Sequence, residues 1–299
     1  MLNNAIFEGI FPVLSLPFTE KKDIDYESLK NLINFCINKN CNGLVMFGVA
    51  SEFYKITDEE SREVIQATVK ENNHRVPLII GAGKLSTETT VMQAKFCEET
   101  GVDGIMVFPP YFIPLNKMQL FNHYKSVANS VKIPLIIQDA PQVSGVSMDM
   151  DFYIQLCDSC DNIRYAKMEG PFSGPKIQAS LAALKDRIQI FDGFGGMYFY
   201  EHLLRGVCGL MPGCGAVDIW VKIFNKFKEG KIEEVKNLYR KILSLVILQN
   251  QENELFIACE KEMLKHRGVI KSISSRNPAA TVDEVIKEII LKNLDELVL

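Results

Sequence analysis

The sequence predicts an α/β protein built as a (β/α)8 TIM barrel with a C-terminal helical extension. Short apolar runs alternate eight times with longer amphipathic stretches. The apolar runs are continuous rather than alternating, so both faces of each strand should be buried, as in a parallel sheet. The eight βα units occupy 230 residues of the chain, which fits a single barrel.

Each strand is expected where an apolar run occurs. In chain order the strands are Ile10–Leu16, Gly43–Phe47, Pro77–Gly81, Gly104–Phe108, Pro134–Gln138, Ile163–Lys167, Ile188–Asp192 and Val207–Met211. A helix should follow each strand, and Asp25, Thr57 and Ser86 are suited to cap the first three. In chain order the helices are Tyr26–Asn38, Asp58–Glu71, a helix from Ser86 to near Glu99, Lys117–Asn129, Asp149–Cys157, Gly174–Ala183, Met197–Arg205 and Ala216–Lys228.

The pattern changes after Gly230. Three further helices, Ile232–Leu248, Leu255–Lys265 and Val282–Asn293, follow without strands between them. We therefore divide the chain into a barrel with the catalytic site, residues 1–230, and a helical extension, residues 231–299. A doubly wound open sheet is the alternative architecture. It usually carries a G-x-G-x-x-G phosphate turn after an early strand, which Gly48-Val49-Ala50-Ser51-Glu52 does not match.

Composition excludes several classes of protein. Of the 299 residues, 47% are hydrophobic, which excludes a mainly disordered chain. The net charge of −4 argues against binding nucleic acid by phosphate neutralisation. We find no signal peptide in the stretch Met1–Glu8 and no run that could span a membrane, so we expect a cytoplasmic protein. The eight cysteines and four histidines lack the spacing of a metal site, and we expect no metal and no cofactor.

Barrel active sites form at the carboxyl ends of the strands, so polar residues there are candidates for chemistry. They are Ser15, Ser51, Glu52, Lys84, Tyr111, Gln138, Asp139, Lys167, Glu169, Asp192 and the turn Met211–Gly215. Lys167 stands out because it ends an apolar strand and should point into the barrel. An amine shielded from water can attack a carbonyl carbon and form a Schiff base. The alternative is a lysine that reaches water or pairs with Glu169.

Two other features carry weaker signals. Tyr111 follows Pro109 and Pro110, which stiffen its loop, and its phenol could relay a proton or simply pack at the rim. The turn from Gly48 to Glu52 could point backbone N–H groups at an anion.

Taken together, these residues resemble the dihydrodipicolinate synthase / N-acetylneuraminate lyase family of Schiff-base lyases. The resemblance runs from Gly9-Ile10-Phe11-Pro12-Val13 through the turn at Gly48, Pro110-Tyr111, Pro141 and Gly145 to Lys167, Gly193, Gly209 and the helical tail. It implies a barrel, often tetrameric, in which Lys167 condenses with a 2-oxo acid. It further implies that Gly48, Ala50, Ser51, Glu52, Gly193 and Met211 bind substrate, and that Tyr111 reaches toward a neighbouring subunit in a homotetramer or homodimer.

Three departures from the family pattern bear on the substrate. The central hydroxyls of the Gly-Thr-Thr-Gly-Glu turn are missing from Gly48–Glu52. Gln138 takes the place of a catalytic tyrosine, and an amide cannot shuttle a proton, although it can hold a water or a hydroxyl. Val143 takes the place of the arginine with which dihydrodipicolinate synthases bind the second substrate's carboxylate, so that activity is not expected.

The strings Gly-x-Ala-Ser-Glu-Phe-Tyr-Lys and Gln-Asp-Ala-Pro are similar to those of 2-keto-3-deoxy sugar-acid dehydratases. We therefore expect a Schiff-base lyase, either a dehydratase or an aldolase, that acts on a 2-oxo acid. Lys167 would be the nucleophile, with Tyr111 and Gln138 as further catalytic candidates. Ser51, Glu52 or a water on Gln138 could serve as the acid or base. The alternative is an altered barrel that binds a 2-oxo acid as a sensor or a structural protein.

Overall fold

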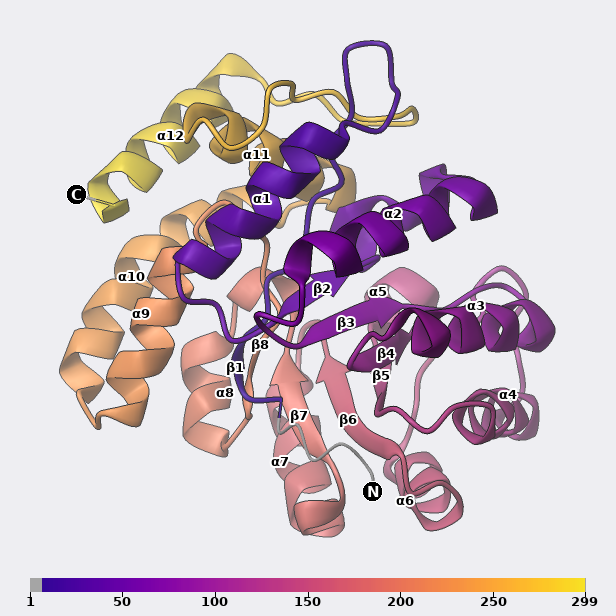
Figure 1. Ribbon diagram of the computed structural model, residues 1–299. Helices are drawn as coiled ribbons and strands as arrows, with labels where there is room; N and C mark the ends of the chain where they lie inside the picture. Colours follow the sequence, from indigo (N-terminus) through magenta and orange to yellow (C-terminus); the bar gives the residue numbers. More distant parts are fainter. Residues whose placement is uncertain (1–6, 299) are drawn as a thin grey trace.

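A computed structural model describes residues 7–298, and it shows a barrel of parallel strands surrounded by helices (Figure 1). Met1–Ile6, most of the stretch considered for a signal peptide, lies outside the described residues. Among residues 7–298, no helix is long and apolar enough to cross a membrane.

Eight parallel strands form the sheet. They are β1 (Gly9–Ile10), β2 (Leu44–Met46), β3 (Leu78–Gly81), β4 (Gly104–Val107), β5 (Leu135–Asp139), β6 (Ile163–Met168), β7 (Gln189–Asp192) and β8 (Gly209–Leu210). Each strand pairs with the next from β2 to β8, and β8 pairs with β1. A parallel bridge between Val13 and Val45 joins the segment after β1 to β2. This bridge closes the barrel and excludes the open sheet.

The helices lie outside the strands, as expected for βα units. They are α1 (Tyr26–Asn38), α2 (Asp58–Asn72), α3 (Thr87–Thr100), α4 (Lys117–Asn129), α5 (Pro141–Ser144), α6 (Met150–Ser159), α7 (Ser173–Leu184), α8 (Phe199–Arg205) and α9 (Val217–Lys228). The three predicted caps are present, and Thr57 forms a full capping box with Glu60 at the start of α2. α5, a single turn that begins at Pro141, was not predicted from the sequence.

The first and last strands are much shorter than predicted. The run Ile10–Leu16 contains Pro12, which has no N–H to donate to a neighbouring strand. The chain beyond it contacts two strands in turn: the Val13 N–H donates to Pro212 O at 2.7 Å, and the Leu14 N–H donates to Val45 O at 2.8 Å. The segment therefore bridges β8 and β2 without forming a regular ladder with either.

Two layers of apolar side chains make up the core. The larger layer lies between the strands and the helices. The smaller layer fills the barrel interior with Phe7, Phe11, Val13, Val45, Ala50, Ile79, Met106, Ile136, Tyr165, Phe191 and Met211. Because side chains alternate along a strand, the residues two positions beyond Ile136 and Tyr165 also face the interior. Those residues are Gln138 and Lys167, which are paired in register between β5 and β6.

Three helices follow the barrel: α10 (Ile232–Gln249), α11 (Asn253–His266) and α12 (Glu284–Val298). α10 packs beside α9, and the yellow α12 packs on α10 and α11 (Figure 1). Phe256 on α11 packs against the barrel interior. The extension therefore covers one end of the barrel, and the boundary at residue 230 stays a prediction.

Candidate active site

A pocket opens at the carboxyl ends of the strands, where barrel active sites form. Its lining residues are Val13, Val49, Ala50, Gln142, Val143, Lys167, Glu169, Phe194, Gly195, Met211, Pro212, Gly213, Asn250, Asn253 and Phe256. Lys167 is the one lysine or arginine in this lining. No cluster of three metal-ligating side chains is found among residues 7–298.

Lys167 lines this pocket and is almost fully buried. Its Nζ is 2.9 Å from Glu169 Oε1. The alternation that turns Lys167 inward also turns Glu169 inward, with Met168 facing the helices between them. The pairing that we weighed as an alternative for Lys167 is therefore present, and it lies inside the pocket.

Glu169 has three polar partners. Its Oε1 forms an ion pair with Lys167 Nζ and accepts a hydrogen bond from Gln138 Nε2 at 2.8 Å. Its Oε2 accepts from the Phe194 backbone N–H at 3.1 Å. Gln138 is buried and reaches the site only through Glu169. The carboxylate is thus fixed beside the amine, and Gln138 orients it from the neighbouring strand.

Gly193 leaves room for this pair of side chains. A Cβ at Gly193 would lie 2.5 Å from Glu169 Cγ and 2.9 Å from Lys167 Cε. Such distances are too short for any side chain to fit without moving both residues. Ala50 and Met211 line the pocket wall. Gly48 lies just behind the wall, where a Cβ would be 2.7 Å from Val13 Cγ1.

Ser51 and Glu52 are not among the residues that line the pocket. Both are fully buried. The Ser51 hydroxyl donates to Leu14 O at 2.6 Å and accepts from the Phe47 N–H at 3.0 Å, so its bonds hold the turn itself. Glu52 pairs with Lys55 and Lys261. The structure therefore gives neither side chain a direct route to a substrate in the pocket.

Tyr111 lies at the rim and is absent from the lining. Its side chain is 41% exposed, and its ring packs edge-on against Phe108 with the ring centres 5.6 Å apart. Within one chain the phenol does not reach Lys167, so any catalytic part for it depends on a second copy.

The other acidic residues at strand ends, Asp139 and Asp192, face the helices. Asp139 accepts from Tyr153 Oη at 2.6 Å. Asp192 lies 2.8 Å from His202 Nδ1, and burial raises the pKa of its carboxyl. His202 Nε2 in turn lies 3.3 Å from Ser173 Oγ. This chain of contacts resembles a hydrolase triad, but all three residues are buried outside the pocket, where they tie α7 and α8 to β7.

Three amide side chains of the pocket were not predicted from the sequence. Gln142 lies on α5, Asn250 caps the end of α10, and Asn253 begins α11. None of them is at a strand end, so the rule that found Lys167 could not find them. A weak signal was available for Gln142, since it stands beside Val143, the residue that aligns with a substrate-binding arginine of the family.

Comparison with known proteins identifies relatives along nearly the whole chain. A model of the dihydrodipicolinate synthetase family matches residues 6–297. The chain is 28% identical to L-2-keto-3-deoxyarabonate dehydratase of Azospirillum brasilense, over 97% of this chain and 96% of that one. It is 25% identical to 4-hydroxy-tetrahydrodipicolinate synthase of Clostridium tetani, over 97% of both chains.

Solved structures show the same fold. A prophage protein of E. coli K12, of the dihydrodipicolinic acid synthase family and in complex with pyruvate, superposes with a TM-score of 0.92 at 24% identity, covering 99% of this chain and 100% of that one. Dihydrodipicolinate synthase of Aquifex aeolicus superposes with a TM-score of 0.91 at 24% identity, covering 97% and 98%. The predicted barrel with helices at its C-terminal end is thereby confirmed.

Proposed function

Since the chain belongs to the dihydrodipicolinate synthetase family, we propose that it is a lyase in which Lys167 forms a Schiff base with a 2-oxo acid. The observation that carries this proposal is the position of Lys167. Its side chain is buried and lines the pocket, at the carboxyl end of β6, with a carboxylate 2.9 Å from the amine.

The first chemical step joins the enzyme to the ketone. The Lys167 amine gives up a proton, and its lone pair attacks the carbonyl carbon to form a carbinolamine. Loss of water then leaves a protonated imine, which draws electrons from the neighbouring carbon and stabilises a carbanion there. The imine serves as the electron sink for the bond that breaks next.

Glu169 is the group that we propose to move protons in these steps. It lies within hydrogen-bond distance of Nζ, so it can take the ammonium proton and return it to the departing hydroxyl. Gln138 cannot transfer a proton, but its amide holds the carboxylate in place. This arrangement supplies an acid and base where the sequence pattern shows the family's tyrosine to be missing.

The pocket favours a substrate whose far end carries hydroxyl groups. Val143 offers no charge to a second carboxylate, and the lining provides the amides of Gln142, Asn250 and Asn253 instead. Amides both donate and accept hydrogen bonds, as do hydroxyls. We therefore propose a 2-keto-3-deoxy sugar acid as substrate, in keeping with the relative named as a 2-keto-3-deoxyarabonate dehydratase.

With such a substrate the proposed reaction is dehydration. Removal of a proton from carbon 3 of the imine gives an enamine, whose electron pair expels the carbon 4 hydroxyl with a proton from the enzyme, as water. The alternative is aldol cleavage, in which the carbon 4 hydroxyl loses its proton and the bond between carbons 3 and 4 breaks. Cleavage leaves a pyruvate enamine and an aldehyde. The two reactions share the Lys167 imine.

Reduction of the imine tests the proposal. The protein is incubated with pyruvate and sodium borohydride, digested, and searched by mass spectrometry for a reduced pyruvyl adduct on the peptide that contains Lys167. The Lys167→Arg variant keeps the positive charge but cannot form an imine, so it should show neither adduct nor turnover.

A panel of 2-keto-3-deoxy sugar acids then separates dehydration from cleavage by the products formed. An unmodified Lys167 peptide, or substantial activity in Lys167→Arg, would overturn the Schiff-base mechanism. An adduct without turnover of any panel member would instead favour a sensor.

A further inference from the structure

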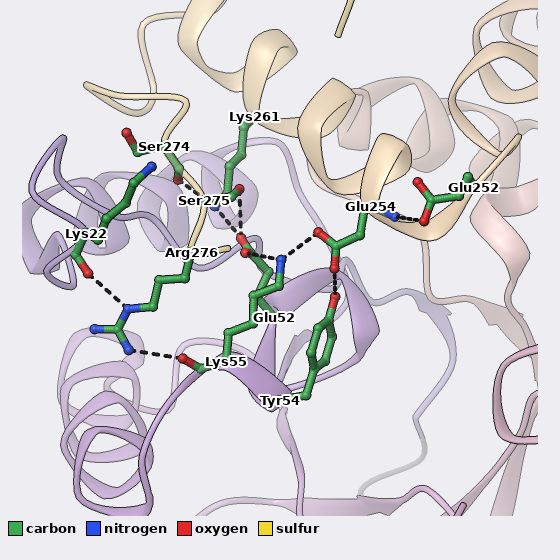
Figure 2. A network of polar contacts seen from close by, with 10 residues as sticks. All are labelled: Lys22, Glu52, Tyr54, Lys55, Glu252, Glu254, Lys261, Ser274, Ser275 and Arg276. Atoms are coloured by element: carbon green, nitrogen blue, oxygen red, sulfur yellow. Dashed lines mark hydrogen bonds and ion pairs between the residues drawn. The ribbon is translucent and has the colours of Figure 1, made fainter. Parts of the chain in front are cut away.

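A buried network of charges connects the turn beside the pocket with the C-terminal helices. Figure 2 shows Glu52 at its centre, facing Lys261 of α11 and Lys55 of its own turn. Glu254, also on α11, accepts from Lys55 Nζ at 2.6 Å. The two ends of each contact between the turn and α11 lie about 200 residues apart in the sequence. Only the tertiary fold brings these charges together.

Lys261 is fully buried, and its hydrogen-bonding capacity is used completely. An ammonium group has three N–H donors. Nζ donates one to Glu52 Oε1, one to Ser274 O at 2.9 Å, and one to Ser275 Oγ at 2.9 Å. The ammonium also lies 4.8 Å from the centre of the Phe18 ring. The fold fixes every partner of the Lys261 ammonium group, and these partners together fix the position of the ammonium group.

Glu52 connects the Lys261 ammonium group to the wall of the pocket. It directly follows the 3-10 turn Val49–Ser51, of which Val49 and Ala50 line the same pocket as Lys167. Its backbone adopts the left-handed conformation, with φ 54°, which costs energy for a residue other than glycine. The side-chain contacts of Glu52 hold the chain in this conformation, and with it the direction of the turn's N–H groups.

We infer that the Glu52–Lys261 ion pair positions the Val49–Ala50 turn for substrate binding, and that α11 is thereby a working part of the active site. This inference rests on the proposed function, because it requires the turn to bind the carboxylate of the 2-oxo acid substrate. Glu52 and Lys261 are positioning residues: neither lines the pocket, and both act through the backbone of the turn.

A contribution to stability alone does not account for this arrangement. A fully buried ion pair gains little over well-packed apolar residues of the same size, because both charges lose their hydration. What such a pair supplies is a defined geometry, since any displacement leaves a charge without its partners. Here the geometry that it defines is that of the pocket wall.

The test is a comparison of two variants with the wild type. Lys261→Met alone leaves the Glu52 charge buried without its main partner, so the double variant Glu52→Gln/Lys261→Met, which removes both charges, is the informative one. Lys287→Met is the matched control. It carries the same substitution and removes a pair with Glu262, the neighbour of Lys261 on α11, without a contact to the turn. Folding of each variant is checked by circular dichroism and thermal melting.

Borohydride trapping of pyruvate on Lys167 is then measured against pyruvate concentration. In the double variant the half-saturating concentration should rise about tenfold or more, while the trapping rate at saturation stays within about twofold of wild type, the pattern of lost ground-state binding. The control should match wild type in both quantities. A folded double variant with an unchanged half-saturating concentration would overturn this inference alone. Absence of trapping in the wild type would overturn the proposed function, and the inference with it.

Discussion

At the scale of single residues, the proposed site depends on Lys167, near the end of β6, and on Glu169, which directly follows that strand. Their spacing of two positions turns both side chains inward, and Gly193, directly after β7, leaves them the space to meet. One more or one fewer residue between them would have placed Glu169 among the helices. The contact between Lys167 and Glu169 is thus a direct product of strand geometry.

Glu169→Gln tests the carboxylate at this scale. The amide keeps the size of the side chain and its bond from the Phe194 N–H, but it cannot accept a proton. We expect kcat to fall by about 10²- to 10⁴-fold, the usual contribution of a positioned acid or base. Turnover of the best sugar acid is measured by steady-state kinetics, with the exposed Glu201→Gln on α8 as control. A kcat near that of wild type would assign the proton transfers to another group.

Val143 gives a prediction on specificity. A valine in the pocket wall cannot bind a carboxylate, so the protein should not condense pyruvate with aspartate semialdehyde at a useful rate. The coupled assay for that condensation measures this directly, with a dihydrodipicolinate synthase as positive control. Efficient turnover would show that another group takes the place of the missing arginine.

At the scale of elements, α11 contacts the barrel mouth at several points. Phe256 lines the pocket, Lys261 holds the turn after β2, and Glu260 holds the loop after β8. Glu260 Oε2 accepts from the Gly215 N–H at 2.7 Å, and Gly213 provides the space for its carboxyl. This helix begins 23 residues after the predicted barrel boundary, yet it shapes two walls of the site.

Glu260 makes stability depend on pH. Its burial raises the pKa of the carboxyl from 4.5 to about 7. Between these values the folded protein binds more protons than the unfolded chain, so the free energy of unfolding falls as pH rises through this window. Above this window the buried, charged carboxylate lowers the free energy of unfolding by its full amount, on the order of 3 kcal/mol. The Glu260→Gln variant lacks this charge, so its stability relative to wild type should increase as pH rises from 5 to 8.

Thermal melting of both proteins across this pH range measures the effect. The Tm of the variant should increase by several degrees relative to the Tm of wild type as pH rises. Parallel curves for the two proteins would show that Glu260 does not titrate in this window.

At the scale of the whole molecule, the loop between β4 and α4 and the first turn of α4 present apolar side chains to solvent. Tyr111, Phe112, Ile113 and Met118 are all exposed. Contiguous exposed apolar side chains commonly mark a protein interface. Family resemblance placed Tyr111 near a neighbouring subunit, and the geometry of one chain leaves it free to meet one.

We therefore predict a homo-oligomer, a tetramer or at least a dimer, with Tyr111 at or near the boundary. Sedimentation at micromolar concentrations should give a mass above that of one chain, and Tyr111→Ala should weaken association or activity. Tyr111→Phe keeps the ring and so separates packing from the hydroxyl. A monomeric wild type would contradict the assembly, whereas full activity of Tyr111→Phe would exclude only a proton relay.

The fold and the position of Lys167 follow from the order of residues along the chain. Eight buried runs with helices between them leave few architectures, and the carboxyl ends of parallel strands must meet at one edge. The position of Lys167 at the end of the sixth run is therefore enough to place it at the mouth of the barrel. The helix starts follow from local capping chemistry at Asp25, Thr57 and Ser86.

The surroundings of Lys167, in contrast, depend on the tertiary structure. The side chains of Glu52 and Ser51 stabilise the turn and do not line the pocket. Asn250 and Asn253, from the helical extension, are part of the pocket lining. Gln138 acts through Glu169. The physical reason is that these contacts join segments far apart in the chain. Local propensity and periodicity report on neighbours in sequence, whereas a buried charge finds its partner only once the core has formed around it.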